Sequence, residues 1–307
     1  MSSSFTFVTD FDGVWTNPFA ELQAVHACVR SELGRLGGIS EEDMLPLYQH
    51  FRAEVLARPE CHGWRLDGRL SSYVDEDYFA VPTSIGQYIE EAPCDDSKKL
   101  RAAVLREWDT VLAFLDNCYH TTCNQFRTEV DHDLTEGAER VLQWLLHEKV
   151  QVVFATNAPA EKVIDWFAHH GYGVMDGRTT EPGEYPLRVY GRSGKQWLGE
   201  TPQVIDFSGR KVDCYRPQYK EILEREHPDL VVGDVLSLDL AQPIALRAEG
   251  SPAGPREVGV MHLRHTPDWV LNSIGPGPTQ VNHLVAHITA LPRIVTKLRG
   301  SDRPAAS

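Results

Sequence analysis

Three short apolar segments, each followed at once by polar residues, constrain the fold of this 307-residue chain more than any other feature. The segments are Phe5–Thr9, Val150–Ala155 and Leu230–Val232, and their length and β-rich composition are typical of buried strands. Directly after them come Asp10-Phe11-Asp12-Gly13, Thr156-Asn157 and Gly233-Asp234. Because the carboxyl ends of parallel strands meet at one edge of a sheet, we expect these polar residues to share one site.

Strands and helices alternate along the second half of the chain. Apolar residues at helical spacing predict helices over Leu134–Glu148, Glu161–His170, Tyr219–Glu226 and Gln280–Lys297. Further strands are predicted at Leu187–Tyr190 and Val258–Leu263, with a hairpin formed by Val204–Phe207 and Lys211–Tyr215. This alternation predicts an α/β fold with a parallel sheet and helices on both faces.

Residues 18–124 have a different pattern. Helical spacing is found over Ala20–Leu36, Glu41–Leu56 and Ser97–Asn117, and no buried-strand segment interrupts them. We therefore predict a mostly helical insert at 18–124, placed after the first strand of a core made of residues 1–17 and 125–300. The Pro-, Ser- and Ala-containing tail, 301–307, is predicted to be disordered.

Bulk composition excludes some classes of function. A formal charge of −14 argues against sequence-independent binding of nucleic acid or of acidic membranes, since both need clustered Lys and Arg. No apolar run is long enough to span a membrane, and the first residues lack the pattern of a secretion signal. The six scattered cysteines are expected to be free thiols, so we expect a cytoplasmic protein. The sequence leaves a homodimer open.

The predicted site favours phosphoryl transfer with a metal ion. Carboxylates brought together repel one another, and Mg²⁺ resolves this because it binds carboxylates together with phosphate oxygens. Asp10 can then act as a nucleophile, and Asp12 can protonate the leaving oxygen and afterwards activate water. The Thr156 hydroxyl can bond a phosphoryl oxygen, and an Arg or Lys would balance the charge of that group.

These residues also resemble the motifs of a known superfamily, the haloacid dehalogenase (HAD) hydrolases. The segments that resemble its first, second and fourth motifs are FVTDFDGVWT at 7–16, VVFATN at 152–157 and LVVGDVLSLD at 230–239. The resemblance, which spans residues 5 to 239, implies a Rossmann-like core with a type 1 helical cap that selects the substrate. It implies Mg²⁺ held by Asp10, the backbone carbonyl of Asp12 and Asp234, with Asp239 in support. The second aspartate, Asp12, is a feature of phosphatase-type members and is missing from the dehalogenases.

The third motif of that superfamily, a Lys or Arg before the helix leading to the fourth, has several candidates here. Arg216, in Arg216-Pro217, occupies an analogous place, and Lys220 is its main competitor. Lys211 and Lys195 are further candidates. We expect Thr156, Asn157 and Arg216 to contact the phosphoryl group of a small phosphorylated substrate.

Three functions follow from the resemblance and the intact aspartates. The first is a Mg²⁺-dependent phosphatase that forms an aspartyl-phosphate. The second is a phosphomutase or a phosphonatase on the same fold; a phosphonatase also needs a cap lysine that forms a Schiff base, for which the insert offers Lys98 and Lys99. The third is a non-catalytic binding module that keeps the fold.

Overall fold

A computed structural model of the chain describes residues 5–129 and 133–300 and divides it into two compact units. One unit comprises residues 1–17 and 132–307, and the other comprises residues 18–131. The predicted boundary at 124 falls inside helix α5 (Val111–Glu129), so the inserted unit runs a few residues further than its sequence pattern indicates. The predicted disordered tail lies outside the described residues.

Within the described residues, the first unit contains a seven-stranded sheet in the order β11-β10-β9-β1-β4-β6-β5, and every pairing in it is parallel. Its strands are β1 (Thr6–Thr9), β4 (Gln151–Ala155), β5 (Met175–Asp176), β6 (Leu187–Tyr190), β9 (Leu230–Gly233), β10 (Glu257–Met261) and β11 (His283–Val285). The strands that precede the predicted site, β9, β1 and β4, are neighbours. Thr9 pairs with both Phe154 and Val232, so the carboxyl ends of these strands lie side by side.

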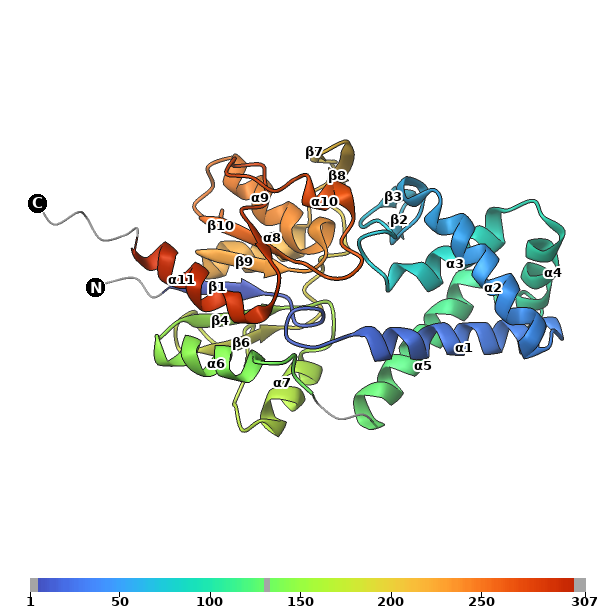
Figure 1. Cartoon of the computed structure of the whole chain (residues 1–307), viewed down its shortest axis with the longest axis horizontal. Helices are drawn as coiled ribbons and strands as arrows, with labels where there is room; N and C mark the ends of the chain where they lie inside the picture. Colours follow the sequence, from blue (N-terminus) through green and yellow to red (C-terminus); the bar gives the residue numbers. More distant parts are fainter. Residues whose placement is uncertain (1–4, 130–132, 301–307) are drawn as a thin grey trace, which may run out of the picture. The chain divides into compact units, whose positions relative to one another are not determined.

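Helices cover both faces of this sheet (Figure 1). They are α6 (Ala138–His147), α7 (Ala160–His169), α8 (Pro217–Glu226), α9 (Ala241–Ala248), α10 (Asp268–Leu271) and α11 (Leu291–Gly300). Apolar residues of α6, α7 and α11 form one core with alternate strand residues such as Phe7, Phe154 and Val232. Figure 1 shows α8 and α9 on the opposite side of the sheet. The predicted Rossmann-like α/β architecture is therefore confirmed.

The predicted closing helix over Gln280–Lys297 is wrong. The edge strand β11 occupies its first half, and α11 begins only at Leu291. Pro292 explains the difference, because proline lacks an N–H and is tolerated in the first turn of a helix but not in its interior. The predicted hairpin is present as β7 (Val204–Phe207) and β8 (Arg210–Asp213), joined through Ser208 and Gly209, both at positive φ.

The second unit is mostly helical, as predicted. It contains α1 (Phe19–Gly37), α2 (Glu41–Leu56), α3 (Ala80–Glu91), α4 (Asp95–Val104) and α5, with a short antiparallel pair, β2 (Arg65–Leu66) and β3 (Arg69–Leu70). Residues such as Val29, Phe51 and Ile85 pack into its own core. The single helix predicted over Ser97–Asn117 is instead two. The chain leaves α4 after Val104, and α5 starts where the Thr110 hydroxyl accepts a bond from Ala113 N at 3.0 Å.

None of the helices in the described part of the chain is long and apolar enough to cross a membrane. All six cysteines are free thiols, as the sequence predicts.

Candidate active site

Asp10 lies at the carboxyl end of the central strand β1, between β9 and β4. Its N–H donates to Val232 O at 3.0 Å, so the neighbouring strand fixes its backbone. The residues after it alternate between the site and the core. Phe11 and Trp15 are fully buried and make edge contacts with Phe154 and Phe167. This aromatic anchor holds the loop so that Asp10 and Asp12 come to the sheet edge.

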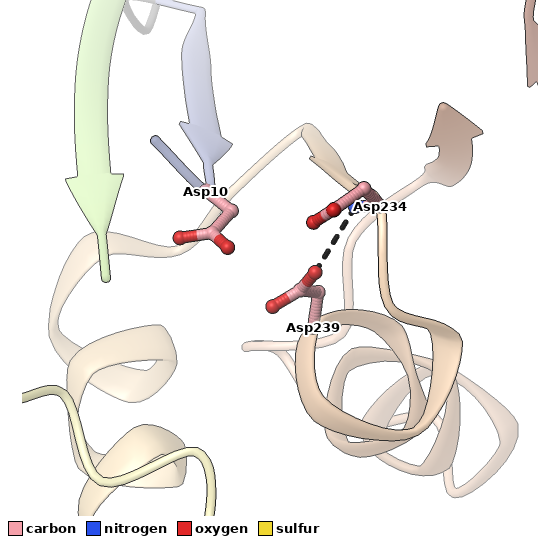
Figure 2. Close-up of side chains that lie close together, drawn as sticks. All are labelled: Asp10, Asp234 and Asp239. Carbon is pink, nitrogen blue, oxygen red and sulfur yellow. Dashed lines mark hydrogen bonds between the residues drawn. The ribbon is translucent and has the colours of Figure 1, made fainter. Parts of the chain in front are cut away.

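Asp234, at the end of β9, packs directly against the loop that follows Asp10. A Cβ on Gly13 would lie 2.1 Å from Asp234 Oδ2, and Gly13 has a φ of +77°, so both space and backbone require glycine there. A Cβ on Gly233 would lie 2.2 Å from the Cβ of Asp239. The two motif glycines therefore let the backbone and three carboxylates approach closely. Asp10, Asp234 and Asp239 each offer an oxygen within 4.8 Å of the others (Figure 2).

Lys195 is the base that contacts these carboxylates. Its Nζ lies 2.9 Å from Asp10 Oδ1 and 2.7 Å from Asp239 Oδ1, and its side chain is only 1% exposed. Asp239 is held from both sides, because its Oδ2 also accepts the N–H groups of Asp234 at 3.0 Å and Val235 at 2.9 Å. Figure 2 shows the bond from Asp234 N. Asp239 thus fixes both Lys195 and the turn that carries Asp234.

The charges of this group perturb one another. Burial raises the pKa of Asp10 to about 7; Lys195 opposes the rise, and the carboxylates of Asp239 and Asp12 add to it. Burial alone would lower the pKa of Lys195, but Asp10 and Asp239 together raise it above its ordinary value. Lys195 is therefore a fixed cation. One cation among three carboxylates leaves the site with an excess of negative charge.

The two main candidates for the third motif make contacts of other kinds within the described part of the chain. Arg216 is fully buried, but its guanidinium donates to the backbone carbonyls of Lys195 and Asp213. Lys220 is about one-third exposed on α8 and pairs with Glu224. Lys211 is exposed on the hairpin strand β8. Arg216 thus supports the backbone at Lys195, and of the four candidates for the third motif Lys195 is the one whose ammonium contacts Asp10 and Asp239.

Thr156 and Asn157 lie at the end of β4, as predicted. The Thr156 side chain is buried, and its Oγ1 accepts a bond from Ala158 N at 3.1 Å, which leaves the hydroxyl proton to be donated. Asn157 has a structural role in this site, because its Oδ1 accepts a hydrogen bond from the backbone N–H of Lys195 at 3.0 Å. Through this bond the end of β4 holds the loop that delivers Lys195.

Asp12 is turned toward helix α7 and is not in the group of three carboxylates. Its Oδ1 accepts the hydroxyl of Thr16 at 3.2 Å. Lys162 Nζ donates to both of its carboxylate oxygens, at 3.0 and 3.1 Å. Lys162 is not among the site residues predicted from the sequence. One feature of the sequence could have indicated it. Lys162 stands beside Val163 on the apolar stripe of the helix that follows Thr156.

Comparison with known proteins finds likeness in structure only. No family model matches the sequence, and no curated protein matches it. A HAD phosphatase from Thermococcus onnurineus matches at a TM-score of 0.46 and 12% identity, over 95% of this chain and 97% of that one. The haloacid dehalogenase-like protein SP0104 from Streptococcus pneumoniae matches at 0.45 and 10% identity, over 96% and 100% of the two chains. A 2-haloacid dehalogenase from Pseudomonas syringae matches at 0.41 and 14%, over 96% and 99%. With TM-scores below 0.5 and identities of 10–14%, the chemistry has to be read from the site itself.

Proposed function

We propose that this chain is a Mg²⁺-dependent phosphatase that hydrolyses a small phosphate monoester through an aspartyl-phosphate on Asp10. The observation that carries the proposal is the arrangement around Asp10 on the central strand. The ammonium group of Lys195 contacts one oxygen of Asp10, and Asp234 lies beside Asp10 at the end of the neighbouring strand. Asp12 follows two residues later in the sequence. This set supplies a nucleophile, a metal site and an acid/base, which is the full requirement for two-step phosphoryl transfer.

The residues present fit Mg²⁺. Asp10 Oδ1 is buried, and the Lys195 ammonium contacts it at 2.9 Å. In Figure 2 the carboxylate of Asp234 points toward Asp10, whereas the oxygens of Asp239 are already bonded. Carboxylate oxygens with an excess of negative charge suit this hard cation. We propose that Asp10, Asp234 and the Asp12 carbonyl hold it and that Asp239 supports them. The ion would neutralise the aspartates and the phosphoryl oxygens together.

The chain's residues then perform two displacements. In the first, an Asp10 oxygen attacks phosphorus, the P–O ester bond breaks, and the leaving oxygen takes the proton of Asp12. In the second, water attacks phosphorus and gives a proton to Asp12, the bond from phosphorus to Asp10 breaks, and phosphate leaves. Asp10 ends as a carboxylate, and the proton that Asp12 gives to the leaving oxygen is replaced by the one that it takes from water. Lys195 holds Asp10 in place, and the Thr156 hydroxyl donates to a phosphoryl oxygen.

The competing functions have less support. Lys98 and Lys99 lie on the exposed face of α4 and pair with Asp95 and Asp96, an arrangement that does not favour a Schiff-base lysine. A non-catalytic module has no need of a lysine buried between two carboxylates. We propose further that the unit of residues 18–131 serves as the cap that selects the substrate. A homodimer remains a prediction.

The proposal is tested by assaying a panel of phosphate monoesters with Mg²⁺. Wild type is compared with Asp10→Asn, Asp12→Asn and a matched control, Asp165→Asn, which alters an exposed residue of α7. We expect both site variants to lose at least about 10³-fold in kcat and the control to equal wild type. Equal turnover by wild type and Asp10→Asn would refute the nucleophile. A second measurement is thermal: Mg²⁺ with beryllofluoride should raise the Tm of wild type but not of Asp234→Asn.

A further inference from the structure

Lys162 is a buried cation of the site that the two displacements above do not use. It lies on the first turn of α7, directly after the loop that carries Thr156, and it is 8% exposed. Its Nζ lies 5.7 Å from the centre of the Trp166 ring, one helical turn on, so its stem follows the surface of α7. Helix α7 packs into the core through Val163 and Phe167. The ammonium group is therefore held by a rigid element.

The contact of Lys162 with Asp12 is specific in geometry. The ammonium donates to both carboxylate oxygens at nearly equal distances, 3.0 and 3.1 Å, which fixes the direction of the carboxylate and not only its charge. Thr16 holds one oxygen from the other side. Asp12 is about one-quarter exposed, so without these partners its side chain would be free to take other rotamers.

The orientation that Lys162 gives to the Asp12 carboxylate has a chemical consequence. The carboxylates of Asp10, Asp234 and Asp239 already form a group of three, and the side chain of Asp12 lies outside that group. A fourth carboxylate drawn toward a bound cation would be lost for proton transfer. Lys162 pulls the carboxylate of Asp12 toward α7 instead, next to the strand end that carries Thr156.

We propose that Lys162 is a positioning residue that holds the Asp12 carboxylate for proton transfer to and from the phosphate ester. The inference rests on the proposed phosphatase function and adds to it a residue outside the motifs of the sequence. Lys162 acts through Asp12, so its loss should matter most where the leaving oxygen needs a proton. An alkyl phosphate has such a leaving group, whereas p-nitrophenolate leaves without one.

The test compares wild type, Lys162→Met and Lys162→Arg with glycerol phosphate and with p-nitrophenyl phosphate. Methionine keeps an unbranched stem over Trp166 and removes the charge. For Lys162→Met we expect kcat on the alkyl ester to fall about 10²-fold with KM within about threefold of wild type. Release of the first nitrophenolate should slow by less than about threefold, and a burst should appear because the second step still needs Asp12. Lys162→Arg should restore part of the loss.

Further variants isolate the route through Asp12. The double variant Lys162→Met/Asp12→Asn should be no slower than Asp12→Asn alone, because the two residues act as one unit. Lys297→Met, an exposed lysine of α11, should equal wild type. An equal loss with both esters in the rate of the first step, in which the leaving group departs, would show a structural role and overturn the proposal. A raised KM at unchanged kcat would mean that Lys162 binds substrate, which also overturns it. If Asp10→Asn is inactive but Lys162→Met is fully active, this inference alone fails, whereas activity of Asp10→Asn would refute the proposed function itself.

Discussion

Replacing Lys195 by methionine should damage both stability and turnover. The Nζ atom lies 2.7 Å from Asp239 and 2.9 Å from Asp10, and at an effective dielectric constant of about 20 each contact is worth ~6 kcal/mol of Coulomb energy. Most of this gain is offset by the cost of burying the ammonium, which is several kcal/mol. Removing the lysine leaves two buried carboxylates without their counter-charge. We therefore expect the free energy of unfolding to fall by about 3–5 kcal/mol.

The loss of turnover should accompany the loss of stability. Without Lys195, Asp10 loses the cation that orients it, and a preorganised charge of this kind is worth about 10²–10³ in kcat. The matched control is Lys220→Met, since Lys220 is about one-third exposed and its pair with Glu224 is worth less than about 1 kcal/mol. Urea unfolding without added metal measures the first effect, and steady-state kinetics at saturating Mg²⁺ measures the second. An inactive Lys220→Met beside a fully active Lys195→Met would refute the assignment.

Two further predictions concern the turn of the site and the inserted unit. Gly13→Ala should weaken Mg²⁺ binding at least about 10-fold, because the new Cβ displaces Asp234; isothermal titration measures this loss of affinity. The same change should cost about 1–2 kcal/mol of stability, because the φ of +77° disfavours alanine; urea unfolding measures this cost. Burial, with Arg52 and Arg30, lowers the pKa of His26 to about 4. The folded state then binds fewer protons than the unfolded state between pH 4 and 6.5, so stability is full above pH 6.5 and is lost as the pH falls, by up to about 3 kcal/mol. His26→Gln should remove this part of the pH dependence of urea unfolding, and an unchanged profile would contradict it.

The central strands and the aspartates were predictable because each leaves a local signal. A buried parallel strand is a short apolar run, and the residue at its end is fixed by the chain itself, so Asp10 and Asp234 follow from their positions after β1 and β9. Asp239 follows because a turn of five residues returns its carboxylate to the N–H of Asp234. These are short-range relations.

Lys195 was not predictable in the same way. It lies in an irregular segment with no helical or strand period, and its place depends on bonds from Asn157 and Arg216, which are far away in sequence. Arg216 precedes a helix, as a third-motif base should, yet tertiary structure turns its guanidinium to backbone carbonyls. Lys162 has a helical period but no motif, because its partner, Asp12, is 150 residues away. Such long-range pairings are invisible to patterns read along the chain.

The central claim is that Asp10 carries the phosphoryl group, and reductive trapping tests it most directly. Wild type is mixed with Mg²⁺ and a phosphate ester that it hydrolyses. The mixture is quenched with borohydride during turnover, and the protein is then digested and analysed by mass spectrometry. Borohydride reduces an aspartyl-phosphate to homoserine, so we predict homoserine at position 10 in wild type. In the control, Asp12→Asn is treated in the same way without substrate, and we predict no homoserine there. Homoserine at another aspartate, or turnover without reduction of Asp10, would contradict the account.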